Sequence, residues 1–469
     1  MPPASAVRTF TWEEIRASTK GASAKQPRVS TKEVVRSSAP RYIVIHRKVY
    51  DVSGDFVAWH PGGEVALTQL GEDASGAFDA FHTEAATEIL ANYYVGDLDP
   101  SEPTKHNAFV DDLSALRARL ENEGQFCSSK AFFFRKFVEV CLISALAWTL
   151  LYRGQGSVLS MLAFGVLTGL FWQQTGWLSH DVLHHQLWTS RRLNHLTGTF
   201  LGNVLQGLSI GWWGHKHSNH HSTPNVHLSD PDIDTMPFLA WSEMALELFN
   251  DVREPTAAAF MVSHQPILYF PLLGLARMSW AYQSIIWQFA KGRIDGDTSA
   301  AGIFRFPTAT VLELAGLILH WTWNIVGVWY CVGWVRTLPV LFFSQIIGGI
   351  LLAVVFSLNH NGMKILTREE SQITNHYELA VVTGRNVHGS ALSTWFTGGL
   401  NYQIEHHMFP TLPRHRLSGI AEEVHSLCKK HHVPYHSTGL FSGLAEVIHR
   451  LARISQEARR RMATNIKTE

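Results

Sequence analysis

A chain of 469 residues is too long for one ordinary core, so its length predicts two or three structural units. Lysine plus arginine and aspartate plus glutamate both number 39, and this balance argues against nucleic acid as a partner. Only 17% of the residues are charged, whereas soluble domains have roughly 25%, and the 16 Trp and 26 Phe suit membrane interfaces. We therefore expect a membrane protein.

The first predicted unit spans residues 8–98. Its stretch 42–52 alternates and is rich in β-branched residues, which is typical of two paired strands around a turn, and helical periodicity follows Pro61. Residues 20–40 are rich in Ser, Lys, Ala and Pro and are predicted to form a loose insertion. Residues 99–130 begin with a run of Pro, Ser and Glu and form a predicted linker.

Two nearly uncharged hairpins in the remaining chain predict about four membrane-spanning helices. The first hairpin covers 137–152 and 158–178, and the second covers about 311–335 and 338–358 around a turn at 336–339. The segments 198–213 and 267–287 are apolar but interrupted, which predicts interfacial or re-entrant helices. The expected fold is an α+β N-terminal domain, an all-α membrane domain over 131–440, and a cytosolic tail over 441–469.

The sequence has 26 histidines, and its three densest histidine groups are HDVLHH at 180–185, HSNHH at 217–221 and QIEHH at 403–407. Positions three or four apart share one face of a helix, so each group can direct several side chains the same way. Because each hairpin returns to its starting side, all three groups and His360 fall on one face of the membrane. Eight or more imidazoles exceed the need of one tetrahedral zinc and suit two metal ions. The alternative is a set of interfacial histidines with only a structural role.

These groups closely resemble the boxes of the front-end fatty acid desaturases, which read HDxxH, HxxHH and QxxHH in that order. The flanking sequences GWLSHD at 176–181 and WFTGGLNYQIEHHMFP at 395–410 also resemble that family. Gln403, in place of the first histidine of the third box, separates the front-end group from most other acyl desaturases. The resemblance implies that the iron ligands are His180, His184, His217, His220, His221, His360, His406 and His407.

Four neighbouring positions have roles that the resemblance leaves open. Gln403 can bind iron weakly, bind through water, or orient a neighbour, because an amide oxygen is a poorer iron ligand than imidazole. His185 is an extra histidine beside the first box, where it can replace or assist His184. Asp181 and Glu405 are expected to orient imidazoles by hydrogen bonds.

Within the N-terminal unit, the sequence WHPGG at 59–63 and the sequence FDAFHTE at 78–84 each supply one histidine. With YYVGD at 93–97, these segments closely resemble cytochrome b5. His60 and His82 are then the axial ligands of haem b, a pair that leaves no site for oxygen and suits electron transfer. The residues expected to wall the haem pocket are Phe56, Leu70, Phe78 and Phe81.

The resemblance implies an oxygen-dependent oxidoreductase with two non-haem irons and a fused haem-containing donor. It introduces a cis double bond between an existing one and the carboxyl end of an acyl chain. The local sequence is most like the Δ6 enzymes of fungi and microalgae, although Δ5 and Δ8 acyl desaturases and sphingolipid Δ8 desaturases share the same boxes. The implied partners are NADH-cytochrome b5 reductase, O2, membrane lipid, and a fatty acyl-CoA or phospholipid acyl substrate.

An external reductase agrees with the lack of a G-x-G-x-x-G fingerprint after a predicted strand. The implied location is the endoplasmic reticulum membrane, with the haem domain and the histidine boxes facing the cytosol. Two other functions are considered. A lipid hydroxylase uses the same chemistry, but the glutamine-containing third box argues against it. An electron-carrying membrane protein with structural histidines would hold haem iron alone.

Overall fold

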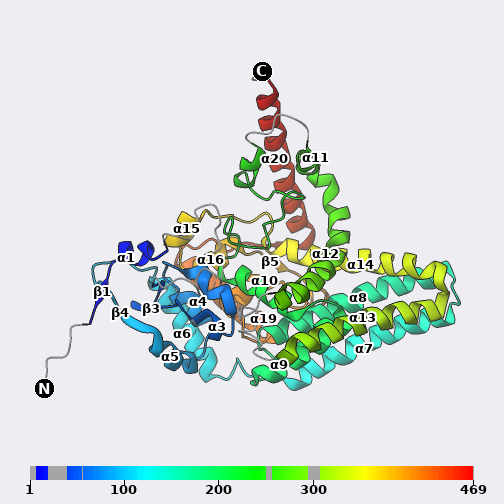
Figure 1. Ribbon diagram of the computed structural model, residues 1–469, viewed down its shortest axis with the longest axis horizontal. Coiled ribbons are helices and arrows are strands. Elements are labelled where there is room, and N and C mark those ends of the chain that lie inside the picture. The colour runs from blue at the N-terminus through cyan, green and yellow to red at the C-terminus, as the bar shows by residue number, and fades with distance from the viewer. Residues whose placement is uncertain (1–6, 20–39, 55, 250–255, 294–306, 468–469) are drawn as a thin grey trace.

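The structure, a computed structural model, describes residues 7–19, 40–54, 56–249, 256–293 and 307–467. The predicted insertion at 20–40 lies outside the described residues except for its last position. A small unit with a sheet lies at one end of the molecule, and a bundle of long helices extends to the other end (Figure 1). Helix α20 stands out from the middle of the molecule (Figure 1).

The N-terminal unit is built on a four-stranded sheet in the order β1-β4-β3-β2. The strands are Thr9–Phe10 (β1), Tyr42–Ile45 (β2), Lys48–Asp51 (β3) and Tyr94–Leu98 (β4). Strands β2 and β3 form the predicted antiparallel hairpin. His46 and Arg47 turn the chain with φ angles of 49° and 62°, as a two-residue hairpin loop of type I′ requires.

Short helices pack on this sheet and complete an α+β unit. They are Trp12–Ala17 (α1), Phe56–Trp59 (α3), Gly63–Gln69 (η1), Ser75–Phe81 (α4), Glu84–Leu90 (α5) and Ala91–Tyr93 (η2). Ile43, Val52, Val57 and Leu70 are buried between the sheet and these helices. The predicted α+β N-terminal domain is confirmed.

The predicted linker at 99–130 contains an ordered helix, Ala108–Asn122 (α6). Asn107 caps its N-terminus by accepting a hydrogen bond from the Val110 amide. The buried residues of α6 recur three or four positions apart and pack against the C-terminal part of the chain. The apolar residues of this segment have helical spacing, and the prediction of a linker missed that pattern.

The two predicted hairpins of long helices lie in the bundle (Figure 1). Their helices are Lys130–Arg153 (α7), Val158–Leu183 (α8), Pro307–Val332 (α13) and Trp334–His360 (α14). Among the described residues, α8, α14 and the Val311–Val332 part of α13 are long and apolar enough to cross a membrane. Helix α7 pairs with α8 as predicted but is not one of these three, because Lys136, Glu139 and Arg153 interrupt its apolar sequence.

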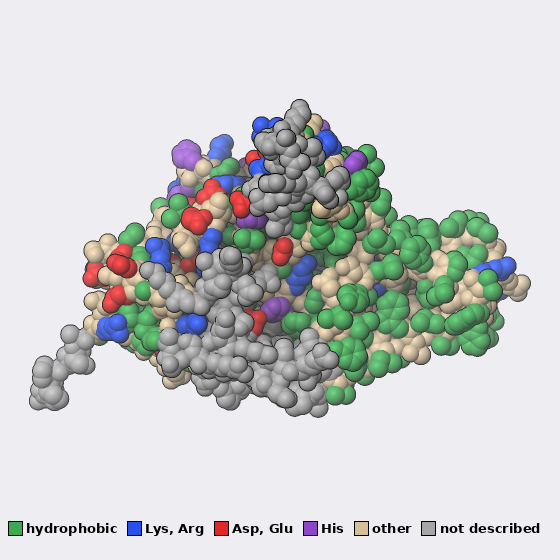
Figure 2. Space-filling model, turned by 45° about the horizontal axis from the view of Figure 1, so that its top comes forward, with side chains coloured by type: hydrophobic (Ala, Val, Ile, Leu, Met, Phe, Trp, Pro, Cys, Tyr) green, Lys and Arg blue, Asp and Glu red, His purple; other side chains and the backbone are tan. Residues whose placement is uncertain are grey.

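Hydrophobic side chains predominate along the bundle, whereas charged side chains gather around the N-terminal unit and near α20 (Figure 2). On α7, Leu142, Leu146 and Leu150 are exposed and follow one another at intervals of four residues. An apolar surface of this extent is unfavourable in water and is solvated by lipid. The helices and their surface identify a multi-pass membrane domain.

The second hairpin turns at Gly333, and the prediction of a turn at 336–339 is wrong. Gly333 has a φ angle of 79°, which glycine adopts at no steric cost. Pro339 lies inside α14 close to its start, so this proline does not end the helix. Proline is a general turn signal, and here the conformation of the preceding glycine decided the turn.

The chain between the two hairpins forms several short elements and one long helix. They are Arg191–Gly198 (α9), Thr199–Gln206 (η3, a π-helix), Ile210–Ser222 (α10), Met244–Phe249 (η4), Ala257–Ser263 (α11) and Gln265–Arg293 (α12). Helices α11 and α12 meet at 104°, as a broken span or a re-entrant segment would. The segment 198–213 is interrupted as predicted, by a turn at Gly207 with a φ angle of 79°.

The C-terminal part covers the end of the bundle that faces the N-terminal unit. Its elements are Arg368–Ile373 (α15), His376–Thr383 (α16), Asn386–His388 (β5), Ala391–Phe396 (α17), Gln403–Met408 (α18), Arg414–Lys430 (α19), Ser437–Gly439 (β6) and Leu440–Lys467 (α20). Residues 441–469 were expected to be a tail, yet they supply most of α20. Val447, Leu451 and Ile454 of this helix are buried against the rest of the chain.

Glycines bring α8 and α14 into close contact. A Cβ atom at Gly169 would lie 2.9 Å from the Gly348 backbone nitrogen and 2.8 Å from Ile347 Cγ2. Small residues at such positions let two helix backbones approach closely within a membrane. The contact fixes α8 and α14 relative to each other, and both helices end in histidine-bearing segments.

We predict that Gly169→Ala lowers the stability of the folded protein by about 1–3 kcal/mol, because the added methyl group forces the two helices apart. The measurement is the thermal unfolding midpoint of the detergent-solubilised protein. Gly214→Ala in α10 is the control, since no atom lies within 4 Å of the added Cβ. Equal midpoints for the two variants would contradict the close contact.

Candidate functional site

Three helix ends bring histidines to the same region of the protein. Helix α8 carries His180 in its last turn and is followed by His184 as its C-cap residue. The second half of α10 carries the second histidine group, and α14 ends at His360. These three helices come from separate parts of the chain. The ends of α8 and α14 lie on the same side, as the two predicted hairpins require, and α10 joins them there.

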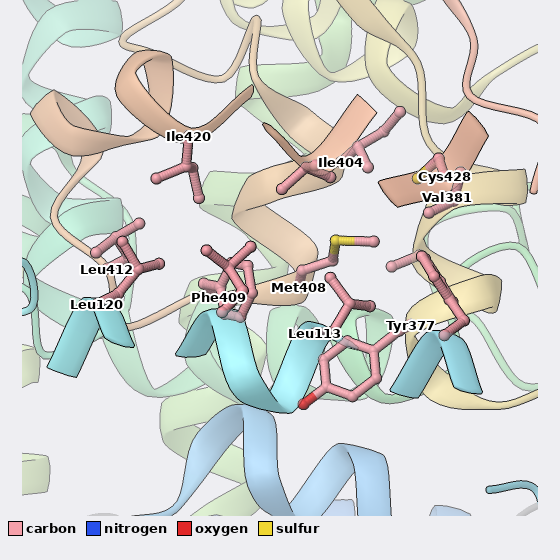
Figure 3. Packing of buried hydrophobic residues seen from close by; sticks show 14 of the residues in the cluster. Leu113, Leu120, Tyr377, Val381, Ile404, Met408, Phe409, Leu412, Ile420 and Cys428 are labelled. Carbon is pink, nitrogen blue, oxygen red and sulfur yellow. The ribbon is translucent and has the colours of Figure 1, made fainter. Parts of the chain in front are cut away.

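Helix α18, which carries the third histidine group, is positioned by its apolar face. Ile404 and Met408 lie in a buried cluster with Leu113 of α6 (Figure 3). Because residues four apart share a face, this packing turns His406 and His407 toward α8 and α10. The His406 ring lies 4.7 Å from the His180 ring, measured between centroids.

The histidines form two adjacent groups, each close enough to hold one metal ion. The first group is His180, His184, His217, His221 and His406. The second group is His220, His360 and His407. Within each group all candidate ligand atoms lie within 4.8 Å of one another. The rings of His221 and His407, one from each group, stack at 4.0 Å, so the two groups are direct neighbours.

Burial keeps most of these imidazoles neutral, which is the form that binds metal. Desolvation, reinforced by neighbouring imidazoles, holds the pKa of His217, His221 and His407 well below the ordinary value. The Nε2 atoms of His180 and His406 are buried without a hydrogen-bond partner. A cation would satisfy them, and imidazole suits iron. The residues present therefore fit two metal ions.

His220 is oriented by a carboxylate. Its Nδ1 donates to Asp230 Oδ2 at 2.9 Å, and its Nε2 lies 3.2 Å from His360 Nε2. Burial alone would lower the pKa of His220, but Asp230 and Asp232 raise it by more. The sequence interpretation gave Asp230 no role. The only signal was the acidic segment DPDID at 230–234, which closely follows the second histidine group.

Asp181 and Glu405, expected to orient imidazoles, bond elsewhere. Asp181 pairs with Arg414 at 3.0 Å, and its nearest approach to His180 Nδ1, 3.6 Å, is too long for a hydrogen bond. Glu405 accepts hydrogen bonds from Asn386 and Tyr435, and burial raises the pKa of Glu405 to about 7. Both carboxyl groups therefore brace the elements around the site.

Gln403 lies beside the second histidine group, whereas His185 belongs to neither group. The Gln403 oxygen accepts a hydrogen bond from Asn359, and its Nε2 lies 2.8 Å from His360 Nε2. His185 follows α8 with a φ angle of 58°, and its side chain is exposed. Thus Gln403 contacts the site through a histidine, and the turn at His185 carries its ring away from the histidine groups.

His60 and His82 face each other in the N-terminal unit, with ring centroids 5.9 Å apart. His60 Nδ1 donates to the Gly63 carbonyl, and His82 Nδ1 donates to the Phe78 carbonyl. These bonds fix both rings and leave each Nε2 as the ligand nitrogen. Burial, with the neighbouring His82, lowers the pKa of His60 to about 4, so its ring is neutral. The pair fits a haem with two axial imidazoles.

Three of the four residues expected around the haem lie beside its expected ligands or in the same core. Phe56 stacks on His60 at 5.4 Å, Phe78 stacks on His82 at 4.6 Å, and Leu70 is buried in the same core. Phe81 has a different environment. Its ring lies 5.9 Å from His221 of the first histidine group and 6.2 Å from His376.

Residues 157–439 match the family model described as fatty acid desaturase. The match covers more than half of the chain and includes all three histidine boxes and His360. The chain belongs to the fatty acid desaturase family. Residues 29–99 of this desaturase match the model described as cytochrome b5-like heme/steroid binding domain. The protein is thus an oxidoreductase with a haem-binding domain at its N-terminal side, and its histidine groups are consistent with a di-iron site.

Curated relatives of this desaturase carry several regioselectivities in their names. The acyl-lipid (9-3)-desaturase of Physcomitrium patens is 34% identical over 90% of this chain and 77% of its own length. The Delta(8)-fatty-acid desaturase of Euglena gracilis is 32% identical over 87% of this chain and 95% of its own length. The Delta(6)-fatty-acid desaturase fat-3 of Caenorhabditis elegans is 29% identical over 88% of this chain and 96% of its own length. The predicted resemblance to front-end desaturases with a cytochrome b5 domain is confirmed.

A small apolar cavity of about 30 Å³ in the desaturase lies against the first histidine group. His180 and Ser179 of α8 form part of its wall. The rest is mainly aromatic and aliphatic, including Trp177, Leu208, Ile210, Trp213, Trp280 and Phe356. Its volume is far below the range of about 300–1,000 Å³ found for sites that bind drug-sized molecules, so an acyl chain enters it only when its walls move apart.

We predict that His406→Ala removes non-haem iron from the desaturase and leaves the haem absorption spectrum unchanged. The substitution takes one of the five imidazoles from the first group, while His60 and His82 lie in another domain. Iron analysis together with the Soret spectrum of the purified protein measures both effects. His388→Ala, at an exposed histidine outside both groups, is the control. Full iron content in His406→Ala would contradict the metal site.

Proposed function

We propose that the protein is a front-end polyunsaturated fatty acid desaturase with Δ6 regioselectivity. It introduces a cis double bond between an existing double bond and the carboxyl end of the acyl chain. Support comes from the third box beginning with Gln403 and from relatives named as Delta(8), Delta(5) and Delta(6) desaturases. We favour Δ6 among these regioselectivities because the local sequence resembles that of Δ6 enzymes. The second candidate is Δ5 or Δ8 activity on acyl chains, or Δ8 activity on sphingolipids.

The observation that carries this proposal is the position of the apolar cavity. His180 belongs both to the first histidine group and to the cavity wall. Trp213 lines the same cavity and stacks on His217 at 4.1 Å. An acyl chain that widened this cavity would lie beside the metal ligands, with aromatic walls that exclude water. This arrangement supports a reaction on unactivated methylene groups.

We assign one iron to the five histidines of the first group and the other iron to the three histidines of the second group. Gln403 orients His360 in this assignment, and His185 is not a ligand. His60 and His82 hold the haem iron. The bond from Asp230 supports the role of His220, because ligating histidines usually donate their second nitrogen to a carboxylate or a carbonyl. His360 is held in the same way by the Thr383 carbonyl.

Two bound irons supply the oxidising power, drawn from O2 and two electrons, that removal of two hydrogens from a methylene pair requires. The residues of the chain do the remaining work. Neutral imidazoles on α8, α10, α14 and α18 fix the site in place, and the cavity wall holds the acyl chain against it. The electrons come from NADH through a separate cytochrome b5 reductase and then through the fused haem domain. We propose that the protein resides in the endoplasmic reticulum membrane with both sites facing the cytosol.

Expression in yeast cells fed linoleic or α-linolenic acid tests the regioselectivity. We expect new products with a double bond at Δ6, identified by mass spectrometry of derivatised fatty acids. The control is the His406→Ala variant, which should give no product. Products with a double bond at Δ5 or Δ8 would replace the Δ6 assignment, and hydroxylated products would replace the desaturase reaction itself.

His60→Ala should abolish product formation while non-haem iron stays bound, because the haem loses one axial ligand and electrons no longer reach the di-iron site. The measurements are fatty acid products, the Soret spectrum and iron content. His106→Ala is the control, since His106 is exposed and bonds only to Asp111 among the contacts that the structure describes for its side chain. Full activity of His60→Ala would mean that the fused domain is not the donor.

A further inference from the structure

The haem domain is hydrogen-bonded to the helix that carries the second histidine box. Thr68 Oγ1 lies 2.7 Å from Ser222 Oγ, and Gln69 Nε2 donates to Ser222 Oγ at 2.9 Å. Thr68 and Gln69 belong to η1, which follows the His60 loop. Ser222 ends α10 and directly follows His221. The segment that carries the first haem ligand therefore contacts the end of a metal-binding helix.

The segment that carries the second haem ligand reaches the same place through Phe81. Phe81 is the last residue of α4 and precedes His82. Its ring stands edge-on to His221, with centroids 5.9 Å apart and an interplanar angle of 80°. His82 is turned toward Phe78, on whose carbonyl and ring it packs. Phe81 thus lies between a predicted haem ligand and a predicted iron ligand.

Further contacts hold the haem domain from another side. A Cβ atom at Gly76 of α4 would lie 2.8 Å from the His376 Cβ atom, so α4 and α16 are in close contact. Lys105 pairs with Glu72 at 3.5 Å and donates to the Ser371 carbonyl at 3.1 Å. Glu72 and Lys105 are both largely shielded from solvent, which strengthens the ion pair relative to an exposed one. The haem domain is therefore held in one position.

We propose that Phe81 is the residue through which the docked haem domain delivers electrons to the di-iron site at His221. The proposal rests on the proposed function, because it requires haem at His60 and His82 and iron at His221. Packed atoms give a continuous path, whereas a gap would leave vacuum or water between the two centres. Thr68, Gln69 and Ser222 act as positioning residues that keep the path closed.

Each passage through this contact moves one electron and breaks no bond. With haem bound at His60 and His82 and iron at the histidine groups, each passage would take the haem from ferrous to ferric and one iron from ferric to ferrous. Two passages supply the two electrons that one desaturation consumes, and NADH replenishes the haem through the reductase after each one. Phe81 itself is not reduced. Its ring fills part of the space between the two centres, so that less of the distance between them lacks packed atoms.

The first experiment follows haem re-oxidation by rapid mixing in the full-length, iron-loaded protein. Phe81→Ala should slow re-oxidation of the ferrous haem by about tenfold or more, equivalent to about 1.4 kcal/mol. Its haem spectrum and its rate of haem reduction by the reductase should match those of the parent. Phe81→Tyr, which keeps the ring, should restore the rate. The control is Ile89→Ala, an apolar truncation in the same domain at a side chain that is 64% exposed.

The second experiment tests the docked position independently of turnover. Thr68→Cys combined with Ser222→Cys should form a reductant-sensitive disulfide in membranes, because the two hydroxyl oxygens are only 2.7 Å apart. Each single-cysteine variant is a control for pairing with the natural cysteines. Failure of the double variant to cross-link would overturn the docked position.

The outcomes separate this inference from the function on which it rests. Loss of the proposed function would show as missing non-haem iron or missing haem in the parent protein. If both are present and Phe81→Ala re-oxidises its haem at the parent rate, the role of Phe81 is overturned and the desaturase assignment stands. If Phe81→Tyr is as slow as Phe81→Ala, the ring is not the path.

Discussion

The burial of eight imidazoles in one small volume is the constraint on which the rest of the structure depends. Neutral imidazole nitrogens that face one another without water are unsatisfied unless a cation lies between them. Their approach requires four helices to end within a few ångströms of one another. The glycine contact at Gly169, the apolar face of α18 and the bond from Asp230 each contribute to that convergence.

The same convergence explains how the soluble and membrane parts of the molecule fit together. Membrane-spanning helices cannot leave polar side chains in lipid, so the histidines occur where α8 and α14 end. The haem domain packs at that same end, where Ser222 and His221 are within its reach. The haem-binding domain and the histidine groups therefore share one side of the bundle, and the apolar surface lies along the rest of it (Figure 2).

Patterns with a strict local period predicted the structure well. The alternation at 42–52 gave the β2–β3 hairpin, and the long apolar segments gave the helices of the bundle. Turn signals were less reliable, because Pro339 was compatible with a helix and Gly333 supplied the turn. The helix α6 was missed where the composition of its flanks suggested a linker, although its apolar residues recur with helical spacing.

The sequence by itself was enough to predict which residues carry the chemistry, because ligands on one face of a helix recur three or four positions apart and that spacing is visible along the chain. It could not determine which histidines share a metal, since each group draws on three or more segments that only folding brings together. The same limit applies to partners of buried groups. Glu405 directly precedes two histidines, yet it accepts hydrogen bonds from Asn386 and Tyr435. Asp230 lies ten residues after His220 and accepts a hydrogen bond from it. Phe81 looked like one more wall residue of the haem pocket, and only the tertiary structure placed it on His221.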